Sequence, residues 1–202
     1  MGQSPTLSSR QIHRIVVGVD FTRTGDDALR EAMLIARGFL ASELHVTHVI
    51  SSREDVHDAD EIDQLSTELQ VKLTELRERV QYVCAPAPDA PPFTQELVFH
   101  VRLGSPAHAL HQVAIDVDAD MLVVGTHGRR GVEKLLLGSV AEELLRIAQL
   151  PLMIAHPKSI DGLRRSDRPE PARPGEDLHS GSLTHRVRIE LTPRTSHISG
   201  LL

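Results

Sequence analysis

The feature that most constrains the fold is a regular alternation of short apolar runs with longer amphipathic segments. The runs are rich in Val, Ile and Leu, as expected of parallel strands that are buried on both faces. The five runs span residues 15–19, 44–50, 97–103, 121–124 and 152–155. With helical patterns between them, they predict a doubly wound α/β fold: a five-stranded parallel sheet with helices on both faces and right-handed crossovers.

Four helices are expected between these strands. Thr24, followed three residues later by Asp27, predicts the start of the first helix. The apolar face expected for this helix consists of Leu29, Ala32, Met33, Ala36, Phe39 and Leu40. The second helix is the clearest, because apolar residues from Ile62 to Val80 recur at helical spacing opposite a charged face. The third begins at 104–106, where a proline suits the first turn, and the fourth covers about 140–148.

The chain is expected to divide into one domain and two terminal segments. We predict a flexible N-terminus over 1–12, the domain over 13–157 and a mostly flexible tail over 158–202. The tail has eight basic and six acidic residues, whereas the part before it has 14 basic and 22 acidic ones. The polar, proline-rich composition of the tail offers too little apolar surface to offset the entropy of ordering.

One piece of the tail, residues 185–191, alternates charged and apolar side chains. This alternation predicts a strand that docks on an exposed sheet edge, of this chain or of a partner. A disordered tail would show the same alternation by chance.

Composition excludes several classes of function. The net charge is −6, and the aromatic residues are only four Phe and one Tyr, with no Trp. Nucleic-acid binding is therefore not expected, because it relies on basic surfaces and stacking platforms. No apolar run approaches the roughly 18 residues that cross a membrane, and the single cysteine, Cys84, excludes an intramolecular disulfide framework and multi-thiolate zinc sites. We expect a cytoplasmic protein with no nucleic-acid or membrane partner.

The carboxyl ends of the expected strands carry the candidate site. In open parallel sheets, ligands bind beyond these ends, where the strand order reverses. Asp20, the segment 104–106 and a glycine-containing segment that starts at Gly125 all follow strand ends. Gly125 and Gly128 would let backbone N–H groups approach an anion. Gly138 and Ser139 then lead into a helix N-terminus, which favours phosphate.

Basic side chains add to this segment, at Arg129, Arg130 and Lys134. The segment fits neither the P-loop nor the dinucleotide fingerprint. A purely structural role is equally open on spacing alone: Ser139 and Glu142 would then form a capping box, the glycines would serve tight turns, and the arginines would be solvated.

At these residues the sequence resembles the universal stress protein family. The pattern Gly-x2-Gly-x9-Gly-Ser, at 125–139, is similar to the nucleotide motif of that family. The resemblance extends in order from about His13 to His156. Its other matching segments are 15–22, 44–49, 104–106, 120–128 and 150–154.

The resemblance implies the adenine nucleotide alpha-hydrolase-like variant of a Rossmann-like sheet, and an ATP-binding protein. Asp20 would contact the adenosine part, and Val49 would hold adenine through its backbone. The residues that would line the ribose and phosphates are Gly125, Thr126, His127, Gly128, Arg129, Arg130, Gly138, Ser139 and Val140. Mg²⁺ or Mn²⁺ would enter with the phosphates, since no dedicated ligand set is present. Some members lack the glycine motif and do not bind ATP; this chain retains it.

The resemblance further implies a cytoplasmic homodimer that pairs through the edge strand Leu152–Ala155. The leading function is a nucleotide-dependent stress-response or signalling module. One alternative is a structural or adaptor protein whose vestigial site binds no nucleotide. Another is a weak ATPase or autophosphorylating protein, although the sequence offers no nucleophile–base pair and no evident general base.

The remaining reactive residues are better explained by structural or surface roles than by catalysis or metal binding. Asp20 would be the phospho-acceptor of a receiver domain only if an Asp followed the third strand, and none does. His108 and His111 lie on one helix without a third metal ligand, and His45 and His48 have opposite strand parity. Cys84 has no neighbouring His or basic pair and is expected to be an inert thiol.

Overall fold

The computed structural model describes residues 11–51, 59–84, 93–126 and 137–156. Nine elements alternate along these residues as the sequence predicts. They are β1 (Arg14–Gly18), α1 (Arg23–Gly38), β2 (Glu43–Ile50), α2 (Ala59–Val83), β3 (Glu96–Leu103), α3 (Pro106–Asp116), β4 (Met121–Gly125), α4 (Ser139–Ile147) and β5 (Leu152–Ala155). The predicted tail strand at 185–191 and the N-terminal segment 1–10 lie outside the described residues.

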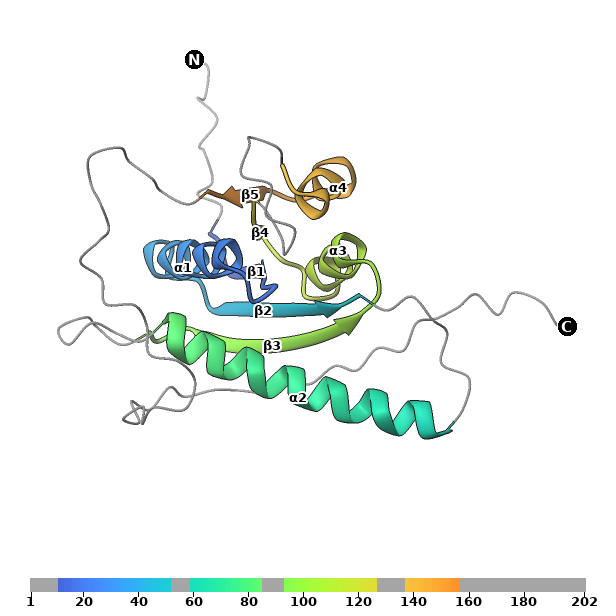
Figure 1. The fold of residues 1–202 in the computed structure, drawn as a ribbon. Coiled ribbons are helices and arrows are strands. Elements are labelled where there is room, and N and C mark those ends of the chain that lie inside the picture. Colours follow the sequence, from blue (N-terminus) through green and yellow to red (C-terminus); the bar gives the residue numbers. More distant parts are fainter. Residues whose placement is uncertain (1–10, 52–58, 85–92, 127–136, 157–202) are drawn as a thin grey trace, which may run out of the picture.

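The five strands form one parallel sheet in the order β3-β2-β1-β4-β5. The chain runs outward from β1 to β3 on one side, then returns to the other side of β1 for β4 and β5. Figure 1 shows α1 beside β1 and β2, α2 along β3, and α3 and α4 together on the other side. The predicted doubly wound α/β fold is confirmed.

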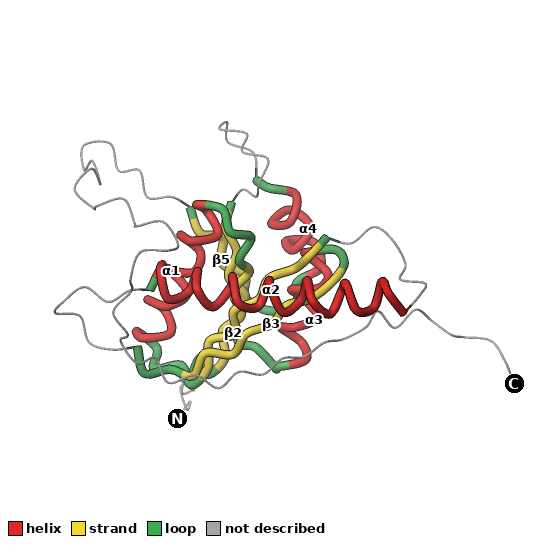
Figure 2. The backbone as a smooth tube through the Cα atoms, turned by 60° about the horizontal axis from the view of Figure 1, so that its bottom comes forward, coloured by secondary structure: helices red, strands yellow, loops and turns green. Residues whose placement is uncertain are grey.

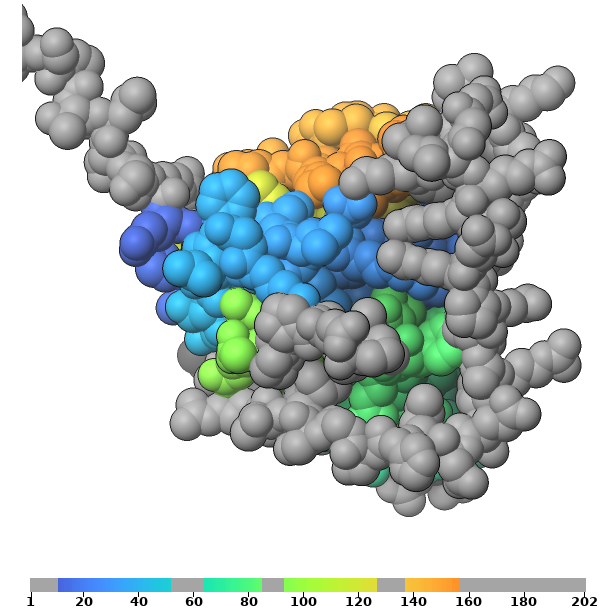
Figure 3. All heavy atoms as spheres, turned by 90° about the vertical axis from the view of Figure 1, so that its left-hand side faces the viewer, coloured from blue at the N-terminus to red at the C-terminus, as the bar shows by residue number. Residues whose placement is uncertain are grey.

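Each face of the sheet buries its own aliphatic core. The core under α1 and α2 includes Leu29, Leu44, Leu76 and Phe99, each at most 1% exposed. The core under α3 and α4 includes Val16, Leu110, Leu122 and Leu144. Figure 2 shows α2 lying across β3, and Figure 3 shows the outer surface of α1 between α2 and the β5–α4 end. In the described part of the chain, both faces of the central strands are therefore covered by helices.

Two details of α1 differ from the sequence prediction. The helix begins at Arg23 with Thr22 as its N-cap, so Thr24 is not the cap. It ends at Gly38, so Phe39 and Leu40 lie beyond it and are 57% and 81% exposed. The apolar pattern overran the helix because the chain turns at Leu40, whose φ is 53°.

Polar side chains are buried where an apolar face was expected. On β2 and β3, His45, Thr47, His100 and Arg102 are between 0 and 6% exposed. His45 Nδ1 lies 2.9 Å from His100 Nε2, and His45 Nε2 lies 2.9 Å from the Glu43 carboxylate. These hydrogen bonds compensate for the burial of the His45 ring. Within the described residues, no helix is long and apolar enough to cross a membrane.

Candidate functional site at the carboxyl edge of the sheet

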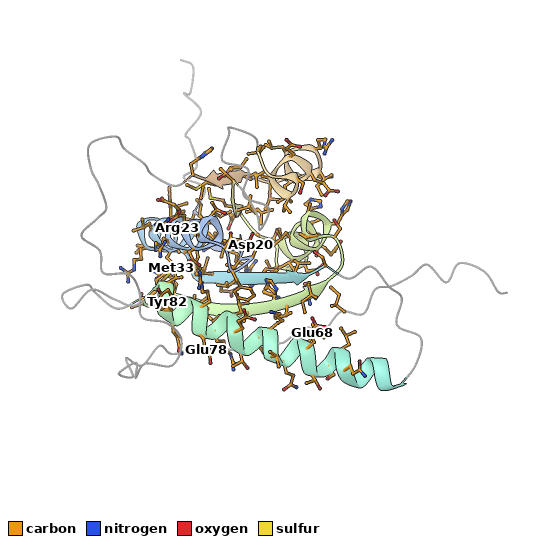
Figure 4. The ribbon with its side chains drawn as sticks, in the orientation of Figure 1. Asp20, Arg23, Met33, Glu68, Glu78 and Tyr82 are labelled. Carbon is orange, nitrogen blue, oxygen red and sulfur yellow. The ribbon has the colours of Figure 1, made fainter. Side chains whose placement is uncertain are left out.

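The site lies where the direction of strand addition reverses. Because β1 pairs with β2 on one side and with β4 on the other, the carboxyl ends of β1 and β4 flank the switch point of the sheet. Asp20 follows β1 and Gly125 ends β4. Figure 4 shows Asp20 between α1 and α3. The structure thus brings together two segments that are about one hundred residues apart in the sequence.

Asp20 organises the turn that leads into α1. Its Oδ1 accepts hydrogen bonds from the Thr22 N–H at 3.0 Å and from the Thr22 hydroxyl at 2.6 Å. Thr22 Oγ1 in turn accepts from the Gly25 N–H at 3.2 Å and caps the helix. The carboxylate is half-buried, so this turn fixes a negative charge at the edge of the switch point.

Two glycines let α1 approach both strand ends. A Cβ on Gly25 would lie 2.5 Å from Asp20 Oδ1, and a Cβ on Gly125 would lie 2.7 Å from the carbonyl oxygen of Thr24. Both distances are too short for real side chains. The first turn of α1 therefore packs directly on the end of β4, and only glycine permits this packing.

The two residues that bound the glycine-containing segment, Thr126 and Gly138, are hydrogen-bonded to each other. The Thr126 N–H donates to the Ala155 carbonyl at 3.2 Å, and the Thr126 carbonyl accepts from the Gly138 N–H at 2.6 Å. We call the hydrogen bond between Thr126 and Gly138 the clasp. Thr126 is completely buried, so the clasp is anchored inside the protein. Gly128 and the other site residues from His127 to Arg130 lie outside the described residues, but both ends of their segment are fixed at the switch point.

The N-terminus of α4 follows the clasp immediately. Gly138 is the N-cap, and no side chain of the described residues caps this helix. Ser139 is exposed and is the first helical residue, so the alternative in which Ser139 caps the helix through a Ser-x-x-Glu box is wrong. Val140 is half-buried against the core under α3 and α4. Among the described residues, the first-turn N–H groups of α4 therefore have no counterpart of the side-chain acceptor that Thr22 supplies in α1.

Val49 lies on the other side of β1 from this clasp. The Thr47 carbonyl accepts from the Val19 N–H of the β1 side, and the Ile50 carbonyl accepts from the Gly104 N–H of the β3 side. Successive residues of a strand direct their backbone groups to opposite neighbours. The N–H and C=O of Val49 consequently point to the β1 side, toward the place where β1 has already ended.

Sequence reasoning missed Thr22 and Gly25, which hold Asp20 in place. Part of the signal was present: an Asp two residues before a Thr favours a side-chain turn, and Gly25 stands in the helical pattern although glycine disfavours a helix. Their partners could not be identified, because the turn packs on a strand that is distant in the sequence.

The other candidate residues stay apart from this site or have structural partners. His108 is exposed and lies 3.2 Å from the Glu143 carboxylate. The described residues contain no group of three or more His, Cys, Asp or Glu side chains that could hold a metal. Burial raises the pKa of the Cys84 thiol to about 12, in line with the inert role expected for it.

Comparison with known proteins gives a consistent result across sequence and structure. Universal stress protein MJ0577 of Methanocaldococcus jannaschii is 23% identical over 159 residues, which cover 72% of this chain and 96% of that protein. Universal stress protein MJ0531 of the same organism is 41% identical over 51 residues, which are 25% of this chain and 30% of that protein.

Solved structures share the same fold. The universal stress protein UspA from Lactobacillus plantarum matches with a TM-score of 0.57 at 22% identity, over 72% of this chain and 99% of that one. A universal stress protein solved in complex with cAMP matches with a TM-score of 0.51 at 24% identity, over 72% of this chain and 98% of that one. The model of the universal stress protein family matches residues 11–156. The chain therefore belongs to the universal stress protein family.

Proposed function

We propose that this protein binds ATP at the switch point between β1 and β4 and acts as a nucleotide-dependent stress-response or signalling module. The observation that carries the proposal is the clasp between Thr126 and Gly138, which joins the end of β4 to the N-terminus of α4, where no described side chain caps the helix. Backbone N–H groups at such a terminus, together with the helix dipole, favour a phosphate.

The N-termini of α1 and α4 both lie at this edge, but their caps differ. This difference supports the assignment of the phosphates to α4. In α1 the Thr22 hydroxyl already accepts the Gly25 N–H. In α4 the N-cap is a glycine without a side chain, and nothing in the described residues fills that role. We assign the phosphate chain to Gly138, Ser139 and Val140, with the segment from Gly125 to Arg130 beside it.

Adenosine belongs at the other half of the site in this proposal. The backbone N–H and C=O of Val49 form a donor–acceptor pair that points past the end of β1. Adenine offers a matching pair, in which a ring nitrogen accepts and the adjacent amino group donates. Guanine has the pair in the reverse order, because its ring N–H donates and its carbonyl accepts. Asp20 follows the end of β1 and would contact the adenosine part.

The related protein solved with cAMP supports an adenine nucleotide as the class of ligand. Mg²⁺ or Mn²⁺ would enter bound to the phosphates. We do not propose an enzymatic function, because the described site presents no nucleophile with an adjacent base. One alternative is a protein with slow ATP hydrolysis or autophosphorylation. The other is an adaptor that binds no nucleotide. The cytoplasm is the compartment that we propose.

Calorimetric titration with Mg-ATP tests the proposal. The wild type should bind ATP more tightly than GTP, and Gly128→Val should lose binding while keeping the far-ultraviolet circular dichroism of the wild type. Gly38→Ala is the matched control, since a Cβ at that position meets nothing within 4 Å. Absence of binding by the wild type at millimolar ATP would support the adaptor alternative, and phosphate release above background would support the ATPase.

We also propose a homodimer that pairs through β5. This strand is the last in the described sheet, and Leu152, Met153 and Ile154 are only half-buried. Light scattering coupled to size exclusion should give twice the chain mass of 22.3 kDa. A mass equal to one chain at micromolar concentration would contradict the dimer.

A further inference from the structure

A buried histidine closes the ladder between β1 and β2 at the edge of the site. The strand register ends with the pair Gly18 and Thr47, and the Val19 N–H makes one more backbone bond to the Thr47 carbonyl. The next bond of a regular parallel ladder would join the Val49 N–H to the Val19 carbonyl. Instead, the Val19 carbonyl lies 2.7 Å from Nδ1 of His48, which therefore carries the proton and donates.

The same histidine holds the residue on the other side of Asp20. The His48 ring lies 4.3 Å from the Phe21 ring, centroid to centroid. Phe21 has a φ of 61°, a left-handed conformation that is uncommon for a bulky residue and must be held by its surroundings. The Lys72 ammonium of α2 lies 5.4 Å from the centroid of the same ring. His48 is 3% exposed, so its contacts are made inside the protein.

These contacts give His48 a position between the two groups assigned to adenosine. Its side chain touches Val19 and Phe21, which flank Asp20, and its backbone precedes Val49. The imidazole thus bonds the Val19 carbonyl at the position where the Val49 N–H would continue the ladder.

We infer that His48 is a positioning residue for base recognition: it ends the β1–β2 ladder one step early and thereby leaves the Val49 backbone pair to the adenine ring. The inference rests on the proposed nucleotide function and extends it to a residue that need not touch the ligand. It also explains why a polar side chain occupies a position on the α1–α2 face, where Leu44 and Val46 of the same strand are apolar.

Two substitutions separate the hydrogen bond from the volume of the side chain. His48→Asn keeps an amide donor near the position of Nδ1, whereas His48→Leu removes the donor and leaves the Val19 carbonyl to the Val49 N–H. His45→Leu is the control for stability, because His45 is equally buried on the same strand but contacts Glu43 and His100 instead of the loop.

Titration with Mg-ATP should give a dissociation constant about tenfold higher for His48→Leu, the effect of losing one hydrogen bond of ordinary strength. His48→Asn should stay within about threefold of the wild type, as expected where a similar donor is retained. His45→Leu should bind like the wild type even if it unfolds at lower urea. Equal affinity of the wild type and His48→Leu would overturn the inference.

Hydrogen exchange provides a readout that does not depend on ligand binding. In the ligand-free protein, the Val49 amide should exchange more slowly in His48→Leu than in the wild type, because it then bonds to the Val19 carbonyl. Unchanged exchange at Val49 would contradict the role of His48 in ending the ladder. Failure of the wild type to bind ATP would overturn the proposed function, and the exchange data would still decide what His48 does to the ladder.

Discussion

Gly125 and Thr24 are in direct backbone contact across the switch point of the sheet. A Cβ at position 125 would lie 2.7 Å from the Thr24 carbonyl oxygen and 2.9 Å from its carbonyl carbon. The contact couples the end of β4 to the first turn of α1, so the two halves of the candidate site share one rigid joint.

Replacement of Gly125 by alanine should disturb this joint. Because the obstructing atoms belong to the backbone, they cannot move aside as a flexible side chain would, and overpacking of this kind costs about 1–3 kcal/mol. Urea denaturation should show this loss, and ATP affinity should fall with it. Gly38→Ala, at the open end of α1, should be neutral or stabilising. Equal stability of Gly125→Ala and the wild type would mean that α1 shifts without cost.

Thr22 should stabilise the protein through its hydroxyl. That group donates to Asp20 Oδ1 and accepts from the Gly25 N–H. Thr22→Val, which has the same shape, should lower the free energy of unfolding by about 1–2 kcal/mol, the usual value of an N-cap. Thr22→Ser retains the hydroxyl and should recover most of the loss. If both variants unfold together in urea, the cap contributes nothing.

Arg79 should be required to compensate the buried charge of Asp26. Its Nε and terminal nitrogen donate to the two carboxylate oxygens at 2.8 and 2.6 Å, and Asp26 is only 5% exposed. Arg79→Met should destabilise the protein by about 2 kcal/mol, because hydrogen bonds to buried charges are strong and one partner would remain. Arg146→Met, at an exposed position of α4, is the control and should change little. The double variant with Asp26→Asn should recover part of the loss.

Cys84 should react slowly with thiol reagents in the folded protein. Burial raises the pKa of its thiol from 9.0 to about 12. Since only the thiolate reacts, the rate at pH 8 should be about tenfold or more below that of the same thiol in urea-unfolded protein, because the loss of thiolate outweighs its higher nucleophilicity. A folded-state rate close to the unfolded one would show that the thiol is open to solvent.

The same shift has a defined sign for stability. The folded protein holds the Cys84 proton more tightly than the unfolded chain, so this contribution is present below pH 9 and is lost as the pH rises toward 12. The free energy of unfolding of the wild type should therefore fall more steeply above pH 9 than that of Cys84→Ala. Parallel pH profiles of the two proteins would contradict this linkage.

The pattern of apolar residues was sufficient to predict the elements and their order. Strand β5 has the predicted bounds, and α3 begins at Pro106 as the proline indicated. Both signals are local: a proline limits its own backbone, and a strand buried on both faces must be apolar throughout. Helix ends were less certain, since Phe39 and Leu40 continue the apolar pattern of α1 after the helix has stopped.

The buried polar groups were beyond prediction from the sequence. A pattern of apolar and polar residues cannot indicate that His45 and His100, 55 positions apart, would share a hydrogen bond inside the protein. Nor could it identify His48 as the partner of the Val19 carbonyl. Such pairs depend on strand register, which forms only when the whole sheet assembles.

The sequence by itself determined the α/β class, the strand and helix order and the residues that follow the strand ends, because these depend on local periodicity and on the geometry of parallel sheets. Only the tertiary structure decided that Gly125 lies against Thr24, that Thr126 and Gly138 form a clasp, and that the first turn of α4 has no side-chain cap among the described residues. The physical reason is that close approach and hydrogen-bond partnership are properties of atoms brought together by folding, and distance along the chain does not encode them.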